Sequence, residues 1–291
     1  MSHVLALIDF SEAGAAVGHR LVDPDTPQLR VTDLAATRGD GIFETASLVE
    51  GRVQALDAHL ERLAQSAAML QLPPPDLAIW REAVLAVGDA LTAAGVVEGS
   101  IKFVLTRGIE GAPVPTGWVF GMASPDFTRD RTEGIRIVLL DRGYRHDVPQ
   151  TSPWLLAGAK TLSYAVNRAA QREAARRGAD DVLFVSSDGY LLEGAVSNLL
   201  LRRGNQLITP RVDLGILAGT TQADLYTWAE AEGFVTGYEL LTPADLETAD
   251  AAWLVSSVRH VAPVRAVDGV ERAIDLPLTE SMNAALNSRT R

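Results

Sequence analysis

The chain of 291 residues contains no cysteine and carries a net charge of −11. This acidic balance argues against a general nucleic-acid surface and against a surface for acidic membranes, because both need an excess of lysine and arginine. The absence of cysteine excludes disulfides and thiolate chemistry. An apolar content of 47% is sufficient for a large core, and the length suggests one large domain or two modest domains.

Metal-binding and targeting patterns are not found. The five histidines are scattered without ligand spacing, so we expect no structural metal; they are His3, His19, His59, His146 and His260. The N-terminus lacks a basic region, and acidic residues interrupt its first apolar run. Neither a signal peptide nor a membrane span is therefore predicted, and a cytoplasmic location is expected.

Two amphipathic helices are predicted in the first third of the chain. Apolar side chains recur at three- and four-residue steps over residues 56–70, which is typical of one buried helical face, and prolines end this helix. Asp76 is the expected N-cap of a second helix, which closes near Gly95. Short strands are predicted at residues 101–106 and 118–122.

The second half mixes strands and helices without strict alternation. Strands are predicted at residues 135–140, 182–185, 198–201, 235–240 and 253–258, and helices near 164–177, 220–232 and 276–286. Asp188-Gly189 is a hairpin signal. This pattern favours an α+β fold with curved, partly antiparallel sheets over a doubly wound parallel fold.

Residues 123–133 contain a proline and several charged residues and lack apolar periodicity. These features predict an interdomain linker. The expected domains are therefore residues 1–122 and residues 134–291.

Lysine is almost absent, since only Lys102 and Lys160 are lysines among 26 basic residues. Lys160 lies in a stretch of small residues, where arginine would have served any simple surface role. A lysine can lose its proton in a partly desolvated site and form an imine with an aldehyde or ketone, which arginine cannot do. Lys160 is therefore a candidate nucleophile, and chance survival of a surface lysine is the alternative.

Three further features could bind a cofactor. The loop at residues 215–221 leads into a predicted helix, and its N–H groups, two threonine hydroxyls and positive helix end would suit a phosphate; an ordinary threonine N-cap is the alternative. Arg62 could reach inward from the first helix or remain solvated. Glu193 is a lone acid between two apolar runs, where burial needs a neutralising partner such as a protonated ring nitrogen. A strand-end glutamate that faces water is the alternative.

Together these motifs resemble the fold-type IV pyridoxal-5′-phosphate enzymes, which include branched-chain aminotransferases, D-amino acid aminotransferases and 4-amino-4-deoxychorismate lyases. The resemblance extends over nearly the whole chain. It is carried by residues 38–45 (RGDGIFET), residues 59–63 (HLERL), Lys160 with Tyr164, Glu193 with Ser197-Asn198, residues 215–221 and residues 255–258 (VSSV). It implies a small α/β N-terminal domain, a linker, and a larger C-terminal pseudo-barrel domain that carries the lysine, with the cofactor between the domains and a homodimer as the assembly.

The resemblance also implies a role for each matched residue. Lys160 corresponds to the lysine that forms the Schiff base with the cofactor and later moves a proton. Glu193 corresponds to the carboxylate that keeps the pyridine nitrogen protonated, and Tyr164 to the hydrogen-bond partner of the phenolic oxygen. Leu217 corresponds to the apolar side chain packed on the ring. The phosphate-binding set corresponds to Arg62, Thr220, Thr221, Ser256 and Ser257.

Two features bear on the reaction. Residues 106–116 lack the Arg and His pair with which D-amino acid aminotransferases grip the substrate carboxylate. The matched segments look most like the aminodeoxychorismate lyases of high-GC bacteria, although the family commonly has arginine where this chain has Gln222. The expected reaction is therefore conversion of 4-amino-4-deoxychorismate to pyruvate and 4-aminobenzoate, a folate precursor.

The residues that contact the substrate are the hardest to predict from the sequence. Arg107 and Arg259 are candidates to hold the two substrate carboxylates, and Phe43 and Thr45 are candidates to line the pocket. An aminotransferase acting on D- or branched-chain amino acids is the alternative, and a non-catalytic family member is a remote one. The expected partners are a small anionic substrate and a second copy of the chain, with no nucleic acid and no membrane.

Overall fold

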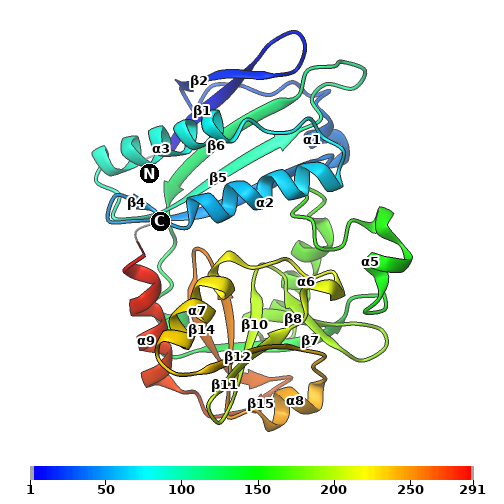
Figure 1. Cartoon of the computed structure of the whole chain (residues 1–291), viewed down its shortest axis with the longest axis vertical. Helices are drawn as coiled ribbons and strands as arrows, with labels where there is room; N and C mark the ends of the chain where they lie inside the picture. Colours follow the sequence, from blue (N-terminus) through cyan, green and yellow to red (C-terminus); the bar gives the residue numbers. More distant parts are fainter. Residues whose placement is uncertain (1–2, 290–291) are drawn as a thin grey trace. The chain divides into compact units, whose positions relative to one another are not determined.

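The computed structural model describes residues 3–289, which separate into two compact units (Figure 1). Unit 1 is formed by residues 3–125, 159–164 and 289, and unit 2 by residues 126–158 and 165–288. Within the described residues, no helix has both the length and the apolar composition that a membrane crossing requires.

Unit 1 is built on an antiparallel sheet that has six strands within the described residues. These are β1 (His3–Phe10), β2 (Ala16–Val22), β3 (Gly41–Val49), β4 (Arg52–Val53), β5 (Glu98–Thr106) and β6 (Thr116–Ala123), in the order β2-β1-β6-β5-β3-β4. The predicted strands at 101–106 and 118–122 lie within β5 and β6 and are confirmed. Alternate residues of β5 point to opposite faces, since Ile101 and Phe103 are fully buried whereas Lys102 is exposed.

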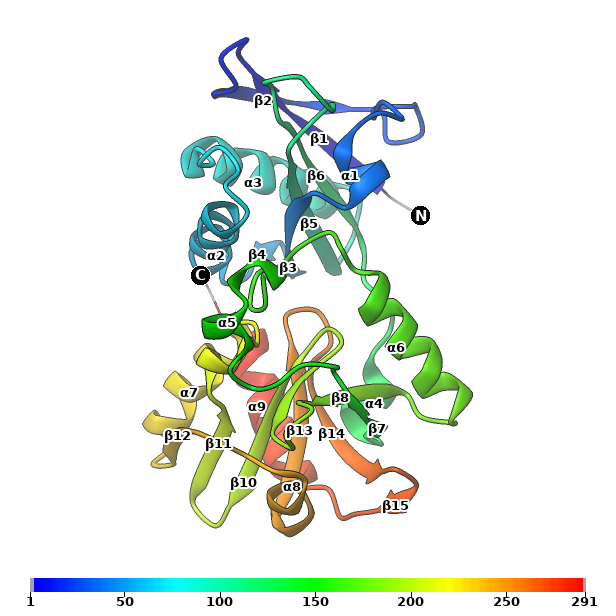
Figure 2. The same cartoon turned by 90° about the vertical axis from the view of Figure 1, so that its right-hand side faces the viewer.

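Helices α2 (Leu56–Met69) and α3 (Leu77–Ala93) cover one face of this sheet (Figure 2). The buried apolar residues of α2 recur at three- and four-residue steps, as predicted. The Asp76 carboxylate accepts hydrogen bonds from the Ala78 and Ile79 N–H groups and so caps α3. Both predicted helices and the predicted cap are therefore confirmed. A short helix, α1 (Leu34–Arg38), precedes β3.

One segment of unit 1, residues 159–164, comes from the middle of the chain and joins β3. The Phe43 N–H donates to the Lys160 carbonyl at 3.0 Å, and the Leu162 N–H donates to the Gly41 carbonyl at 2.8 Å. A side chain at Gly41 would lie only 2.8 Å from a backbone oxygen of β5, so this close approach requires glycine. Lys160 therefore belongs with the N-terminal unit rather than with residues 134–291, because backbone hydrogen bonds hold it there.

Unit 2 contains a mixed sheet with nine strands among the described residues. These are β7 (Ile135–Asp141), β8 (Asp181–Val185), β9 (Leu191–Gly194), β10 (Asn198–Arg203), β11 (Gln206–Pro210), β12 (Val235–Glu239), β13 (Ala251–Ser256), β14 (His260–Val267) and β15 (Val270–Glu271), in the order β12-β11-β10-β13-β14-β7-β8-β9, with β15 beside β14. Every strand predicted in this half has a counterpart. The antiparallel pairing of β8 with β9 confirms the hairpin at Asp188-Gly189.

The curved sheet of unit 2 (Figure 2) has buried apolar clusters on both faces. Leu199 and Leu201 of β10 pack into a core shared with β7, β8, β13 and β14. Leu200 points the other way, into a core completed by α7 (Thr220–Ala231) and α9 (Leu276–Asn287). The two-residue period of the strand thus feeds both cores, and the expected α+β class is confirmed.

The remaining helices of unit 2 are α4 (Thr128–Thr132), α5 (Val148–Thr151), α6 (Ala165–Arg176) and α8 (Pro243–Thr248), with short 3₁₀ turns at Pro153–Leu155 and Val212–Leu214. Helix α4 lies inside the segment 123–133 that the sequence marks as a linker. Its Arg131 donates to the carbonyl oxygens of Arg259 at 2.9 Å and Val258 at 3.2 Å. These hydrogen bonds join the segment to the turn between β13 and β14. The sequence does not predict this contact, because a five-residue helix is too short to show apolar periodicity.

Candidate active site

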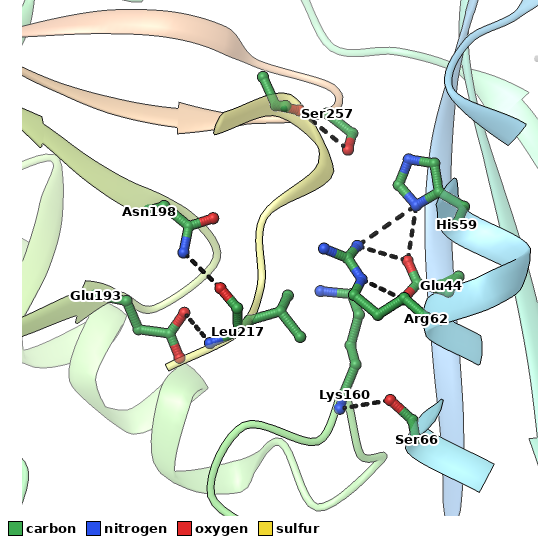
Figure 3. Close-up of polar contacts among 10 residues, drawn as sticks. Glu44, His59, Arg62, Ser66, Lys160, Glu193, Asn198, Leu217 and Ser257 are labelled. Carbon is green, nitrogen blue, oxygen red and sulfur yellow. Dashed lines mark hydrogen bonds and ion pairs between the residues drawn. The ribbon is translucent and has the colours of Figure 1, made fainter. Parts of the chain in front are cut away.

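The backbone of Lys160 is held in unit 1 at both of its polar atoms. The Lys160 N–H donates to the Ser66 hydroxyl oxygen at 3.2 Å (Figure 3), and the Lys160 carbonyl accepts from Phe43. The Lys160 Nζ lies 4.7 Å from the centroid of the Phe43 ring. The Tyr164 ring meets the same Phe43 ring edge-on, with centroids 5.4 Å apart. The structure thus brings together three of the residues that the sequence singled out.

A buried ionic cluster lies between β3 and α2 of unit 1. Arg62 Nε and Nη2 donate to the two carboxylate oxygens of Glu44, each at 2.7 Å, and His59 Nδ1 lies 2.8 Å from Glu44 Oε2 (Figure 3). Burial acts to raise the pKa of Glu44, but the charge and hydrogen bonds of Arg62, with those of His59, outweigh it and lower that pKa to about 2. Glu44 is therefore an anion that sets the direction of the Arg62 guanidinium.

The sequence left open whether Arg62 reaches inward or remains solvated. In the structure Arg62 is buried. Sequence reasoning assigned no role to Glu44 or His59. A signal was available, because Glu44 is an acid within an apolar strand and His59 precedes Arg62 by three residues, on the same side of the helix. Burial also lowers the pKa of His59, although Glu44 acts to raise it.

In unit 2, the backbone of Leu217 is held from two sides. Its N–H donates to Glu193 Oε2 at 3.1 Å, and its carbonyl accepts from Asn198 Nδ2 at 2.9 Å (Figure 3). Glu193 lies near the end of β9 and Asn198 begins β10, across a turn closed by a bond from the Gly194 N–H to the Ser197 carbonyl. The half-buried Glu193 is therefore anchored by a backbone N–H, and it does not simply face water.

The loop that contains Leu217 runs into the start of α7. A Cβ on Gly219 would lie 2.0 Å from Asn198 Oδ1, so only glycine allows Asn198 to hold this loop. Thr220 and Thr221 are the first residues of α7, and Thr221 Oγ1 lies 3.3 Å from Ser257 Oγ. Two hydroxyls thus stand together at the positive end of a twelve-residue helix, an arrangement that suits a phosphate.

Two other residues of the predicted set, and Gln222, can be placed. Ser256 ends β13, next to Ser257. Thr45 lies on β3 with its Cα opposite that of Lys102 on β5. Gln222, where the family commonly has arginine, is buried and its side-chain oxygen accepts from the Tyr238 hydroxyl at 3.2 Å. Gln222 therefore joins α7 to β12.

Both arginines proposed for the substrate carboxylates bind carboxylates of the chain itself. Arg107 Nε donates to Asp40 Oδ2 at 2.7 Å, and its other nitrogens reach the carbonyl oxygens of Leu70 and Gln71 at the end of α2. Arg259 is buried and donates to Asp181 Oδ2 at 2.8 Å. These contacts favour structural roles for the two guanidinium groups.

The donor set fits a cofactor that carries an aldehyde, a basic ring nitrogen and a phosphate. Lys160 offers an amine, Glu193 offers an anchored carboxylate, and the start of α7 offers hydroxyls and N–H groups that Gly219 leaves unobstructed. Within residues 3–289, no three His, Asp or Glu side chains are grouped as metal ligands would be. The residues present therefore suit pyridoxal 5′-phosphate.

The sequence model of the amino-transferase class IV family matches residues 41–267. The chain belongs to this family, whose members depend on pyridoxal 5′-phosphate, and the expected two-domain fold of type IV is confirmed. The protein is thus a pyridoxal-phosphate enzyme acting on small molecules, either a lyase or a transaminase.

Three relatives illustrate the similarity. A bifunctional aminodeoxychorismate lyase/D-amino acid transaminase of Mycobacterium tuberculosis is 44% identical over 259 residues, which cover 86% of this chain and 89% of the relative. The structure of a fold IV-transaminase, CpuTA1, from Curtobacterium pusillum is 53% identical, covers 98% of this chain and 97% of its own, and has a TM-score of 0.94. The PLP-bound form of a hypothetical aminotransferase from Mycobacterium tuberculosis is 39% identical, covers 99% and 98%, and has a TM-score of 0.92.

Proposed function

We propose that the protein is an aminodeoxychorismate lyase, which converts 4-amino-4-deoxychorismate to 4-aminobenzoate and pyruvate. The choice of a lyase over a transaminase rests on the side chains of the loop at residues 106–116. Its one arginine, Arg107, is bound to Asp40 and to backbone carbonyls, and the loop contains no histidine. The carboxylate grip of D-amino acid aminotransferases is therefore not supplied by this loop. The name of the mycobacterial relative, which includes the lyase activity, supports the same reading.

The proposed chemistry divides between the cofactor and the chain. When bound, pyridoxal 5′-phosphate supplies an aldehyde that condenses with amines and a protonated ring that withdraws electrons. Lys160 would hold this aldehyde through its amine, and Lys160 Nζ, once free, would take the proton from the substrate ring. Glu193 keeps the proton on the pyridine nitrogen. Loss of the enolpyruvyl group as pyruvate leaves the aromatic ring of 4-aminobenzoate.

The other residues of the set bind and orient. Arg62, aligned by Glu44, and the hydroxyls of Thr220, Thr221 and Ser257 would bind the phosphate, with Ser256 beside them. The Tyr164 hydroxyl would hydrogen-bond the phenolic oxygen of the cofactor, and the Leu217 side chain would contact its ring.

Product stoichiometry tests the proposal. The holoenzyme is supplied with aminodeoxychorismate and no keto acid. A lyase needs one substrate, so 4-aminobenzoate and pyruvate should appear in equal amounts over many turnovers per site. The proposal fails if product stops at one equivalent per site and the yellow colour bleaches.

A D-amino acid transaminase is the second candidate, because the mycobacterial relative carries that activity in its name and the Curtobacterium structure is described as a transaminase. A transaminase would bleach with a D- or branched-chain amino acid, and 2-oxoglutarate or pyruvate would restore the colour. Failure of the lyase test together with this cycle would establish the transaminase.

The proposal extends to the setting of the reaction. 4-Aminobenzoate is a folate precursor, so we place the enzyme in folate biosynthesis in the cytoplasm. The family resemblance implies a homodimer, which measurement of the molar mass in solution tests directly.

A further inference from the structure

The Ser257 hydroxyl is presented by a short turn of unit 2. This turn runs from Ser257 to Arg259, between the end of β13 at Ser256 and the start of β14 at His260. The Ser257 hydroxyl (Figure 3) lies 3.3 Å from Thr221 Oγ1, in the first turn of α7. The position of the turn therefore decides whether this hydroxyl meets the start of α7.

Side chains from two distant elements bind Arg259 within the turn. Arg259 Nη2 donates to Oδ2 of Asp181, the first residue of β8, at 2.8 Å. The Arg259 carbonyl accepts from Arg131 Nε of α4 at 2.9 Å, and Arg131 Nη2 donates to the Val258 carbonyl at 3.2 Å. The turn is therefore held through the side chain of Arg259 and through two consecutive carbonyl groups.

A third element, α9, fixes the strand that follows the turn. Asn283 Oδ1 accepts from the Val261 N–H, and Asn283 Nδ2 donates to the Val261 carbonyl, each at 3.0 Å. His260 has a φ of +62°, in the left-handed region that residues other than glycine rarely adopt. Such a conformation persists where the surrounding contacts over-determine it, and it is concentrated at functional sites. The hydrogen bonds to Arg259 and Val261, on either side of His260, supply these contacts.

The ion pair of Arg259 with Asp181 is buried, since the two residues are 8% and 1% exposed. Such a pair adds little stability compared with apolar residues of the same volume, because the cost of removing two charges from water offsets their attraction. A charge-assisted hydrogen bond does have a defined direction. The Asp181 carboxylate is itself oriented, because its Oδ1 accepts from the Val182 N–H at 2.9 Å. The pair therefore supplies a fixed position for the turn.

We propose that Arg259 is a positioning residue for the cofactor phosphate, because its bonds to Asp181 and Arg131 hold the Ser257 hydroxyl beside the start of α7. The effect is indirect, since the guanidinium is occupied by Asp181 and acts through Ser257. The hydroxyl is in place before the cofactor arrives, which lowers the ordering cost of phosphate binding. This inference rests on the phosphate set of the proposed function and is independent of the choice between lyase and transaminase.

The test measures the affinity of the full-length protein, freed of cofactor, for pyridoxal 5′-phosphate and for pyridoxal. The two ligands carry the same aldehyde and ring, and they differ in the phosphate. The phosphorus resonance of bound pyridoxal 5′-phosphate reports the contacts of the phosphate directly. Thermal unfolding of each cofactor-free variant measures stability separately.

The variants separate the position of the turn from the stability of unit 2. Arg259→Met removes the guanidinium but leaves Asp181 buried without its partner, so the double variant Asp181→Asn/Arg259→Met removes both charges and protects the fold. Arg259→Lys can still pair with Asp181. Ser257→Ala removes the hydroxyl itself. The matched control is Arg203→Met, because Arg203 donates to Asp245 at 2.6 Å where β10 pairs with the start of β13, at the opposite end of β13 from the turn.

Arg259→Met and the double variant should bind pyridoxal 5′-phosphate on the order of tenfold more weakly, as expected when a hydrogen bond to a charged phosphate is lost. Pyridoxal affinity should change by less than about twofold, because pyridoxal lacks the group that Ser257 binds. Arg259→Lys should recover most of the loss, and Arg203→Met should match the unmodified protein. The phosphorus resonance should shift as it does in Ser257→Ala. Adding Ser257→Ala to the double variant should weaken binding no further, because both changes remove the same contact.

Unchanged affinity for pyridoxal 5′-phosphate in Arg259→Met and the double variant would overturn the inference. Equal weakening of both ligands would also overturn it, because the ion pair would then support only the fold of unit 2. Losses that add when Ser257→Ala is combined with the double variant would show that Arg259 does not act through Ser257.

Failure of the proposed function can be told apart from these outcomes. The lyase assignment fails on product stoichiometry, which leaves the ratio of the two affinities unaffected. The phosphate role of Ser257 fails if Ser257→Ala binds both ligands as the unmodified protein does, and the inference about Arg259 fails with it.

Discussion

The carboxylate of Glu193 accepts a hydrogen bond from the backbone N–H of Leu217 at 3.1 Å. The acid proposed for the ring nitrogen and the side chain proposed for the ring face are thus joined directly. The Asn198 side chain donates to the Leu217 carbonyl, so Leu217 is held by a hydrogen bond at each of its backbone polar atoms. Glu193 is therefore oriented before any ligand binds, which reduces the reorganisation that its proposed role requires.

Lys160 is expected to carry the cofactor. Borohydride reduction of the yellow protein should fix the cofactor covalently to a peptide that contains Lys160, and Lys160→Ala should eliminate turnover while the fold is retained. Lys102 is the alternative site of labelling, because the amines of both lysines lie within 5 Å of the centroid of the Phe43 ring. Peptide mapping by mass spectrometry decides between them. A label on Lys102, or none on a cofactor-loaded protein, would contradict the assignment.

Glu193→Gln should retain the cofactor but slow proton abstraction by orders of magnitude. The amide oxygen can still accept from the Leu217 N–H, but a neutral amide cannot keep the pyridine nitrogen protonated. Stopped-flow absorbance and cofactor content measure the two effects separately. Glu247→Gln, on the exposed side of α8, is the control for the same change of side chain. Normal turnover in Glu193→Gln would mean that this acid has only a structural role.

Arg62→Ala should weaken cofactor binding by about 1.5–3 kcal/mol, because it removes a charge-assisted contact to the phosphate. It also leaves Glu44 buried without its main partner, at a cost in folding stability of about 3–5 kcal/mol. The double variant Glu44→Gln/Arg62→Met removes both charges, so it should be more stable than Arg62→Ala and yet bind the cofactor as weakly. Thermal unfolding and cofactor titration separate the effects. Undiminished cofactor affinity in both variants would remove Arg62 from the phosphate set.

The Glu44 cluster should make the protein lose stability in acid. The pKa of Glu44 is about 2 in the folded state against an ordinary value of 4.5, so its contribution is complete above pH 4.5 and is lost as the pH falls toward 2. The shift corresponds to about 3 kcal/mol. His59, whose pKa is lowered from 6.5, adds to the loss below that pH because the unfolded chain takes up its proton first. Urea unfolding from pH 7 to pH 3 should show a smaller loss in Glu44→Gln. An equal loss in both proteins would refute this account.

The helices and most strands followed from local patterns. The apolar period of α2, the Asp76 cap of α3 and the hairpin at Asp188-Gly189 each depend on residues that are near one another in the chain, so the sequence alone predicts them. The motifs that predict the cofactor are equally local. The rare lysine among small residues, the lone acid between apolar runs and the glycine-threonine helix start can each be recognised from neighbouring residues.

What the sequence could not decide was which distant groups meet. The burial of Arg62 depends on Glu44, a residue of another element. The pairing of Arg107 with Asp40 and of Arg259 with Asp181 likewise joins residues that are far apart in the chain. The placement of residues 159–164 beside β3 and of Lys102 over Phe43 likewise arises from strand pairing between segments far apart in the chain. A charged side chain has the same local signature whether it is free or paired. Only the tertiary structure determines the partner, because the energy of a charge depends on its burial and on what lies within a few ångströms of it.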